Sequence, residues 1–327
     1  MKHFNTAMFK FFAFTFFSFC LNIAAFANPV ADSSFTETPM VLHTATGDIF
    51  GTLTVPNNFS KGEVALIIAG SGPTDRNGNN PVMKNNSLQM LAYGLAANNI
   101  ASLRYDKRGI AESKTAMTAE ADLRFENYIN DAKDWIALLK KDKRFSKLVV
   151  IGHSEGSLIG MIAAYQLADG YVSIAGAGRS ADKILKEQLD KQPQNVKDLS
   201  FPIIDSLAQG KTVTKVDPML FSLFRPSVQP YIISWFRYDP QVEIKKLSIP
   251  VLVAQGTSDI QVSTEDAQLL SKANSHAQLL LIDGMNHIFK IIDGDRNANI
   301  ASYSNPSLPI SDKLVTGIVS FIKKMKN

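Results

Sequence analysis

The chain has 327 residues, of which 45% are hydrophobic and 20% are charged, and its formal net charge is +4 at pH 7. This length is enough for one large domain with its own hydrophobic core. The charged residues are scattered, so no basic stripe argues for nucleic-acid binding. One cysteine and five histidines are too few for a metal-binding cluster, and we expect no metal site.

The first 27 residues have the pattern of a secretory signal peptide. Two lysines precede an apolar run over residues 11–27, which ends in an A-x-A cleavage pattern. A retained membrane anchor is the alternative, but a run of this length is short for a membrane span. We therefore expect a cleaved leader, a periplasmic or secreted protein, and no membrane span in the mature chain. The only cysteine, Cys20, leaves with the leader, which excludes disulfides from the mature chain.

The mature chain is expected to begin with a hairpin. Residues 28–38 are polar and are predicted to be a loose leader to the fold. Residues 41–46 and 49–55 alternate around a Gly47-Asp48 turn, which predicts two antiparallel strands.

Continuous apolar segments then alternate with amphipathic ones. The apolar segments are typical of strands that are buried on both faces inside a parallel sheet. Alternation of such strands with helices predicts a parallel sheet covered on both faces. The predicted strands cover residues 64–69, 100–105, 148–151, 172–177, 251–255 and 278–282, and the predicted helices cover 87–97, 125–142, 157–164, 264–273 and 310–325.

Residues 178–247 interrupt this alternation. The segment opens with a charged helix over 181–192, and the remainder contains repeated prolines and crowded aromatic residues. It is inserted between two predicted strands, at the carboxyl edge where doubly wound sheets bind ligands. We therefore predict a helical cap over 178–247 on a core made of residues 28–177 and 248–327.

The pentapeptide Gly152-His153-Ser154-Glu155-Gly156 matches the pattern G-x-S-x-G. A glycine-rich turn with a helix-capping serine is the simpler interpretation of such a pattern. Here a buried strand precedes it and a helix follows it, which indicates a nucleophile elbow. In an elbow, Ser154 lies at the carboxyl end of the strand, beside the free N–H groups of a helix.

A nucleophilic serine needs a base, and the base needs a group that orients it. Asp259 and His287 each follow a predicted strand, at the same edge as Ser154 and in the chain order Ser, Asp, His. Asp283 is the alternative orienting carboxylate, but it lies only four residues before His287 and is expected to shape that loop. His153 is expected to pack beside the site. These residues predict the catalytic triad Ser154, Asp259 and His287.

The tetrahedral intermediate of such a reaction needs hydrogen-bond donors for its oxyanion. The backbone N–H of Glu155, directly after the serine, is the first predicted donor. The loop Gly70-Ser71-Gly72 follows strand 64–69 and supplies the second, the N–H of Ser71 or, failing that, of Gly72. The loop lacks the spacings of nucleotide-binding motifs, which argues against a phosphate cradle.

Several of these motifs together resemble the α/β-hydrolases of the bacterial serine aminopeptidase-like or FrsA-like group. The resemblance implies an eight-stranded, mostly parallel sheet and hydrolysis of an ester, thioester or amide through an acyl-enzyme, without a cofactor. It departs at Ala111, where D-x-R-G-x-G-x-S has its second glycine, and we expect Asp106 and Arg108 to form a structural ion pair. The matching segments are residues 70–78, 104–109, 152–156 and 284–287, together with Asp259.

The expected function is hydrolysis of a carboxylic ester with a small to medium acyl group. The aromatic cap would supply an apolar acyl pocket, although the same aromatics could be only the core of the cap. A thioesterase and an aminopeptidase are alternatives, and the second requires a carboxylate for a substrate ammonium, for which Glu155 and Asp205 are the candidates. A non-catalytic binding protein on the same fold is the alternative from another class. The expected partner is a small-molecule ester, with no nucleic acid.

Overall fold

The computed structural model describes residues 34–325 of the chain. The predicted signal peptide lies outside the described residues. Within them, the helices are all too short or too polar to cross a bilayer.

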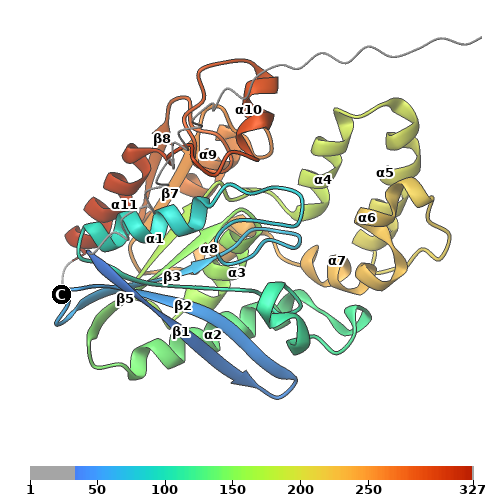
Figure 1. The fold of residues 1–327 in the computed structure, drawn as a ribbon. Helices are drawn as coiled ribbons and strands as arrows, with labels where there is room; N and C mark the ends of the chain where they lie inside the picture. Colours follow the sequence, from blue (N-terminus) through green and yellow to red (C-terminus); the bar gives the residue numbers. More distant parts are fainter. Residues whose placement is uncertain (1–33, 326–327) are drawn as a thin grey trace, which may run out of the picture. The chain divides into compact units, whose positions relative to one another are not determined.

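An eight-stranded sheet forms the centre of the fold, in the order β1-β2-β4-β3-β5-β6-β7-β8 (Figure 1). Its first two strands, β1 (Phe35–Thr44) and β2 (Gly47–Pro56), form the predicted antiparallel hairpin, and β2 also pairs antiparallel with β4 (Ala101–Tyr105). The remaining neighbours are parallel: β3 (Gly62–Ile68), β5 (Phe145–His153), β6 (Gly170–Ile174), β7 (Val251–Gly256) and β8 (Ala277–Ile282). The expected eight-stranded, mostly parallel sheet is confirmed.

The hairpin begins earlier than the sequence suggested. β1 starts at Phe35, which pairs with Pro56, and the centroid of its ring lies 4.5 Å from that of Tyr93. The prediction that residues 28–38 form a loose leader was therefore wrong for the part of this segment that belongs to β1. Polar residues are tolerated here because β1 is an edge strand and much of it faces solvent.

The core lies in two layers, one on each face of the sheet. In β3, Ala65 and Ile67 point to one layer, and Val64 and Leu66 point to the other, as the two-residue period of a strand requires. The first layer is covered by α1 (Ser87–Ala97) and α11 (Asp312–Lys324). The second is covered by α2 (Phe125–Lys141), α3 (Glu155–Ala164) and α9 (Thr264–Ala273). Burial on both faces explains why the parallel strands are apolar throughout.

The segment predicted as a cap is helical and follows β6. It contains α4 (Ala181–Asp190), α5 (Gln194–Ala208), η3 (Pro218–Leu220), α6 (Phe221–Phe224), η4 (Pro226–Val228), α7 (Gln229–Trp235) and α8 (Pro240–Lys245). Helices α4 to α7 lie together beside the sheet (Figure 1). In contrast, α8 packs against α3 and α9, two helices of the core. The boundaries 178–247 of the cap remain a prediction.

Most of these helices were not resolved by sequence reasoning, for a physical reason. Prolines that looked like breaks occupy the first turns of η3, η4, α7 and α8. Proline is well suited to these positions, because its missing N–H has no partner in the first turn of a helix.

Three further short helices lie in the connections. Two of them, η1 (Ala111–Ala116) and η2 (Glu120–Asp122), follow β4, and α10 (Arg296–Ser302) follows β8. The sequence pattern predicted no element at α10. Its start is marked by Asp295, whose carboxylate accepts from the N–H groups of Asn297 and Ala298, a typical N-cap.

Candidate active site

Ser154 lies in a sharp turn between β5 and α3. Its backbone angles, φ 54° and ψ −120°, are costly for a residue that has a side chain. The two glycines of the motif make the turn feasible. A Cβ atom at Gly152 would lie 2.2 Å from the carbonyl oxygen of Gly156, and one at Gly156 would lie 2.4 Å from that of Ile68. The local geometry is that of a nucleophile elbow.

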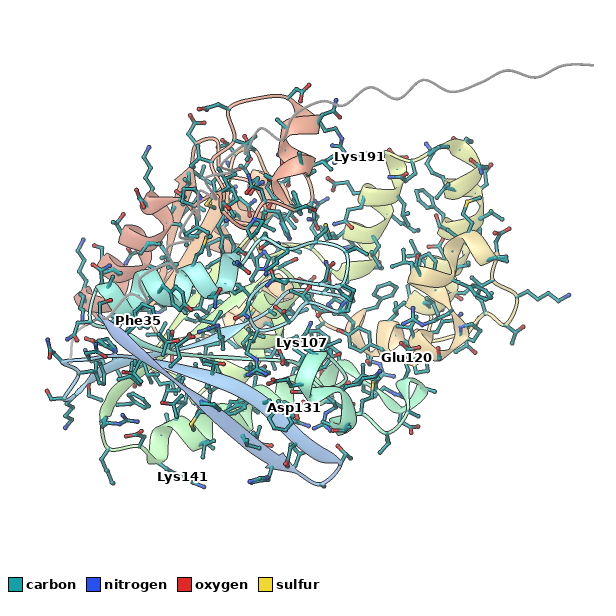
Figure 2. The ribbon with its side chains drawn as sticks, viewed as in Figure 1. Phe35, Lys107, Glu120, Asp131, Lys141 and Lys191 are labelled. Atoms are coloured by element: carbon teal, nitrogen blue, oxygen red, sulfur yellow. The ribbon has the colours of Figure 1, made fainter. Side chains whose placement is uncertain are left out.

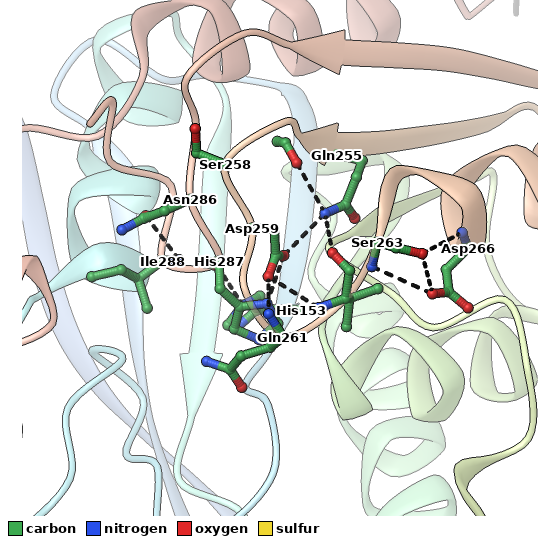
Figure 3. A network of polar contacts seen from close by, with 12 residues as sticks. His153, Gln255, Ser258, Asp259, Gln261, Ser263, Asp266, Asn286, His287 and Ile288 are labelled. Atoms are coloured by element: carbon green, nitrogen blue, oxygen red, sulfur yellow. Dashed lines mark hydrogen bonds and ion pairs between the residues drawn. The ribbon is translucent and has the colours of Figure 1, made fainter. Parts of the chain in front are cut away.

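Asp259 and His287 form a buried pair (Figure 3). His287 Nδ1 lies 2.8 Å from Asp259 Oδ2, and the side chains are 5% and 1% exposed. A carboxylate only accepts, so Nδ1 carries the proton and Nε2 of the neutral ring is left as a base. Asp283 accepts instead from the Thr257 hydroxyl at 3.0 Å, and it shapes the loop as expected.

The Asp259 carboxylate is held ionised by its surroundings. Its second oxygen accepts from the N–H groups of Gln261 and Val262 at 2.8 and 3.0 Å, and Gln255 donates to the first at 3.0 Å. Burial alone would raise the pKa of Asp259, but His287 and the two backbone donors outweigh it and hold the pKa below its ordinary value. Asp259 can therefore fix the orientation of the imidazole.

The residue before the serine, His153, touches the base. Its Nε2 donates to the carbonyl oxygen of His287 at 2.9 Å, and the two ring centroids lie 4.8 Å apart. Burial, reinforced by His287, lowers the pKa of His153 to about 3, so it is neutral. The prediction that His153 packs beside the site is confirmed. No hydrogen bond joins the Ser154 hydroxyl to the His287 ring, although both residues belong to the described part of the chain.

The two predicted oxyanion donors border the same cavity as Ser154. Ser71 and Glu155 both line it. A Cβ atom at Gly70 would lie 3.1 Å from Ser154 Cβ, so the loop passes directly against the serine. The N–H of Glu155 is the first of α3 and has no acceptor within its helix.

This cavity has a volume of about 740 Å³ and lies between the core and the cap segment. Both sides contribute large apolar side chains, among them Leu158 and Tyr128 from the core, and Ile184, Leu223, Tyr231 and Trp235 from the cap segment. An apolar cavity beside a reactive group is the usual form of a small-molecule site.

Every charged side chain that lines the cavity is already paired within the described residues. Six such side chains contribute to the lining. Lys107 Nζ lies 2.8 Å from Glu155, Arg108 lies 2.5 Å from Asp131, and Arg179 lies 2.8 Å from Asp266. Arg225 pairs with Glu120, the sixth group. The cavity therefore offers a ligand no unpaired charge.

One expectation about charged residues was wrong. Asp106 and Arg108 do not pair with each other. Asp106 lies 2.6 Å from Arg76, and Arg108 lies 2.5 Å from Asp131 on α2. The chain turns at Arg108, and each of the two side chains is held by a partner on another part of the fold.

The candidates for holding a substrate ammonium also fail. The Glu155 carboxylate is occupied by Lys107 and by the hydroxyl of Tyr231. Asp205 is exposed and paired with Lys186 at 2.5 Å, and it does not line the cavity.

Sequence reasoning missed the support of the His287 loop. Asn286 donates to Asn299 Oδ1 at 3.1 Å and to the Ser302 hydroxyl at 2.8 Å. Asn299 in turn donates to the carbonyl oxygen of Ser258 at 2.7 Å. Helix α10 thus ties the loop of the base to the loop of Asp259. The N-cap at Asp295 was the signal that would have found this helix.

Residues 34–325 contain no group of three or more histidine, cysteine, aspartate or glutamate side chains placed to hold a metal ion.

Comparison with known proteins finds similarity to hydrolases. The family model described as "Serine aminopeptidase, S33" matches residues 84–232, which is less than half of the chain. Esterase EstD of Thermotoga maritima is 28% identical over 272 residues, which cover 77% of this chain. The chain spans 60% of the length of that relative.

Solved structures show the same architecture. Est1E from Butyrivibrio proteoclasticus, solved with ferulic acid bound, has a TM-score of 0.60 at 17% identity, over 87% of this chain and 100% of that one. A bromoperoxidase from Bacillus anthracis has a TM-score of 0.53 at 15% identity, over 88% and 100%. These likenesses concern the fold, which hosts more than one chemistry. The strand order, the elbow after β5 and these similarities show that the chain has the α/β-hydrolase fold.

Proposed function

We propose that this protein is a serine hydrolase that cleaves carboxylic esters with neutral, small to medium acyl groups. The observation that carries the proposal is the buried hydrogen bond between Asp259 and His287. This hydrogen bond orients the His287 ring as a base at the same edge of the sheet as Ser154. The Thermotoga relative, which is named an esterase, supports the same reaction class.

The proposed reaction proceeds through an acyl-enzyme. Ser154 Oγ attacks the ester carbonyl carbon while His287 Nε2 takes the hydroxyl proton. The carbonyl oxygen becomes an oxyanion, which accepts from the N–H groups of Glu155 and Ser71. The intermediate expels the alcohol, which receives the proton from His287. Water then attacks the carbonyl carbon of the acyl-enzyme while His287 takes its proton. The second intermediate releases the acid, and Ser154 Oγ receives the proton back from His287.

The pairing of charges in the cavity favours a neutral ester over a peptide with a free amino group. An aminopeptidase must hold an ammonium group, and this requires a carboxylate that is free to pair with it. The two carboxylates that line the cavity, Glu120 and Glu155, are held by Arg225 and Lys107. Releasing either one would leave a buried or half-buried cation without its partner, which is costly.

The test is a comparison of the wild type with Ser154→Ala. We expect the wild type to react with a fluorophosphonate probe and to hydrolyse p-nitrophenyl esters, with an optimum within the short to medium acyl chains. Ser154→Ala should lose both. The exposed Ser60, in the connection between β2 and β3, provides a matched control, because Ser60→Ala should keep both.

Two results would redirect the proposal. A wild type that neither labels nor turns over would indicate a binding protein on this scaffold. Faster turnover of aminoacyl arylamides than of esters would indicate a peptidase.

We further propose that the protein is exported after cleavage of residues 1–27. The support is the sequence pattern of the leader. Sequencing of the exported chain should give Asn28 as its first residue, whereas a chain that retains Met1 would contradict export by cleavage.

A further inference from the structure

We propose that Lys107 and Glu155 are positioning residues that aim both oxyanion donors, and that Tyr231 ties them to the cap segment. This inference rests on the proposed function. It adds a positioning device made of Lys107, Glu155 and Tyr231, which the triad does not require. It is carried by three hydrogen bonds between residues that line the cavity and the loop beside it.

Lys107 lies near the middle of the view in Figure 2 and is buried. It lies two positions after the end of β4. Its ammonium group donates to the carbonyl oxygen of Gly70 at 2.5 Å and to Glu155 Oε2 at 2.8 Å. It also lies 5.0 Å from the ring centroid of Tyr128. The side chains of Lys107 and Glu155 are 1% and 3% exposed. A lysine has three donors, and these two acceptors and the aromatic face surround the group.

The bond to Gly70 determines where the Ser71 N–H points. The carbonyl of Gly70 and the N–H of Ser71 belong to one planar trans peptide, in which the two groups point in opposite directions. A cation that holds the oxygen therefore fixes the direction of the N–H. It also draws electron density from the peptide, which makes the N–H a stronger donor.

Glu155 connects the second donor to the same device. Its backbone N–H is the other predicted oxyanion donor, and its carboxylate is the counter-ion of Lys107. The Lys107 ammonium group thus links the loop after β3, through Gly70, to the first residue of α3. The two donors are held relative to each other as well as to Ser154.

Tyr231 extends the device to the cap segment. Its hydroxyl, on α7, donates to Glu155 Oε1 at 2.5 Å. Burial and the charge of Glu155 raise the pKa of Tyr231 well above its ordinary value, so the hydroxyl remains a donor. Because Tyr231 also lines the cavity, an acyl group bound there contacts the residue that braces Glu155.

Stability alone is a poor reason for such a pair. Removing two charges from water costs about as much as their attraction returns, and apolar residues of similar size often serve a core equally well. The location of the Lys107–Glu155 pair explains it better, because its hydrogen bonds join the loop after β3, the start of α3 and helix α7 next to Ser154.

The test compares two double variants, each of which neutralises an ion pair that has a buried cation. Lys107→Met with Glu155→Gln removes the proposed device without leaving a buried charge unpaired. The matched control is Arg104→Met with Glu37→Gln, because Arg104 is 2% exposed, lies on β4 and contacts Glu37 at 2.6 Å, away from the cavity lining. Both should be measured for thermal unfolding, for kcat and KM with p-nitrophenyl butyrate, and for inhibition by an alkyl trifluoromethyl ketone.

We expect the first double variant to lose kcat by about 10- to 100-fold, less than the 100- to 1,000-fold that deleting an oxyanion donor costs. KM should stay within about twofold, and the ketone, which forms an oxyanion on Ser154, should bind more weakly by the factor lost in kcat. The control should lose stability but keep kcat. Tyr231→Phe should give a smaller loss of kcat in the same direction, and it serves if the double variant does not fold.

An unchanged kcat and an unchanged ketone affinity in the first double variant, or in Tyr231→Phe if only that variant folds, would overturn the inference. In that case the wild type remains an active, probe-reactive esterase. Failure of the proposed function looks different, since the wild type itself would then be inert toward esters and the fluorophosphonate, and both proposals would fall together.

Discussion

The ring of His153 donates a hydrogen bond to the backbone carbonyl of His287 at 2.9 Å, across 134 positions of the sequence. His153 directly precedes Ser154, so this bond joins the segment that holds the proposed nucleophile to the loop that holds the proposed base. The ring is 7% exposed and also meets the ring of Phe289 edge-on. The relative placement of Ser154 and His287 therefore depends on a second imidazole, that of His153, which is neutral.

The first prediction is that His153→Phe lowers kcat by about 10-fold with little change in KM. Phenylalanine keeps the ring packing but cannot donate, and a shift of about 1 Å in a reacting group can cost about 100-fold. Ester kinetics would check this, and His153→Gln, which retains an N–H donor, should recover part of the rate. Full activity in His153→Phe would show that the bond does not position the base.

The second prediction concerns stability and pH. The pKa of His153 is about 3 in the folded protein, because of burial and then of His287, and about 6.5 in an unfolded chain. Between these values the unfolded state binds more protons, so the contribution of His153 to stability is complete above pH 6.5 and is lost as the pH falls. The free energy of unfolding should fall by about 1.4 kcal/mol per pH unit from this group.

Urea unfolding of the wild type and of His153→Phe between pH 7 and pH 4 would measure this contribution. The variant should show a flatter dependence over this range, because it no longer takes up the proton. Parallel curves would mean that His153 is protonated in the folded state.

The third prediction separates the two candidate orienting carboxylates. Asp259→Asn should lower kcat by about 10⁴-fold while leaving the fold intact, because an amide can donate to Nδ1 and favour the wrong tautomer. Asp283→Asn is the matched control and should keep nearly full activity, since within residues 34–325 the Asp283 carboxylate accepts a side-chain hydrogen bond only from Thr257, in the loop after β7. Circular dichroism would verify that both variants fold. A small effect at Asp259 would assign the orienting role to another group.

The sequence was most informative where local pattern and burial agree. The elbow at Ser154 could be predicted because the strand, the two glycines and the helix are all local, and each glycine is required by backbone atoms within 3 Å of its missing Cβ. The parallel strands could be predicted because burial on both faces leaves them apolar. Asp259 and His287 could be paired because strand ends meet at one sheet edge.

The remainder depends on partners that are distant in sequence. The expected pair of Asp106 and Arg108 was wrong because their actual partners, Arg76 and Asp131, lie on a loop and a helix whose positions only the fold determines. The pairing of Lys107 with Glu155 is of the same kind, since 48 positions separate them. No spacing rule indicates such contacts.

The fourth prediction concerns the link between α10 and the His287 loop. The Asn286 side chain donates to Asn299 and Ser302 and accepts from the N–H groups of Ile288 and Lys290 at 3.2 and 3.0 Å. Asn286→Ala should therefore destabilise the protein by about 1–3 kcal/mol, because buried partners lose their hydrogen bonds, and it should lower kcat. Urea unfolding and ester kinetics would check this.

Asn297, an exposed asparagine of helix α10, serves as the control for Asn286. Asn297→Ala should leave both stability and kcat close to those of the wild type, because only the backbone N–H of Asn297 takes part in the N-cap at Asp295. If both variants behave alike, the link between α10 and the His287 loop is not important for the site.

The fifth prediction concerns the length of the acyl group. Trp235 lines the cavity and stacks on Phe125, with ring centroids 6.0 Å apart and planes 15° apart. Trp235→Ala would enlarge the cavity and remove apolar contact, so kcat/KM should fall for p-nitrophenyl acetate and shift toward longer acyl chains. Phe221→Ala is the matched control, because Phe221 is 46% exposed and does not line the cavity. An acyl-chain series should change its optimum only in the first variant. An unchanged optimum in Trp235→Ala would mean that the acyl group lies elsewhere and that these aromatic residues serve only to pack the cap segment.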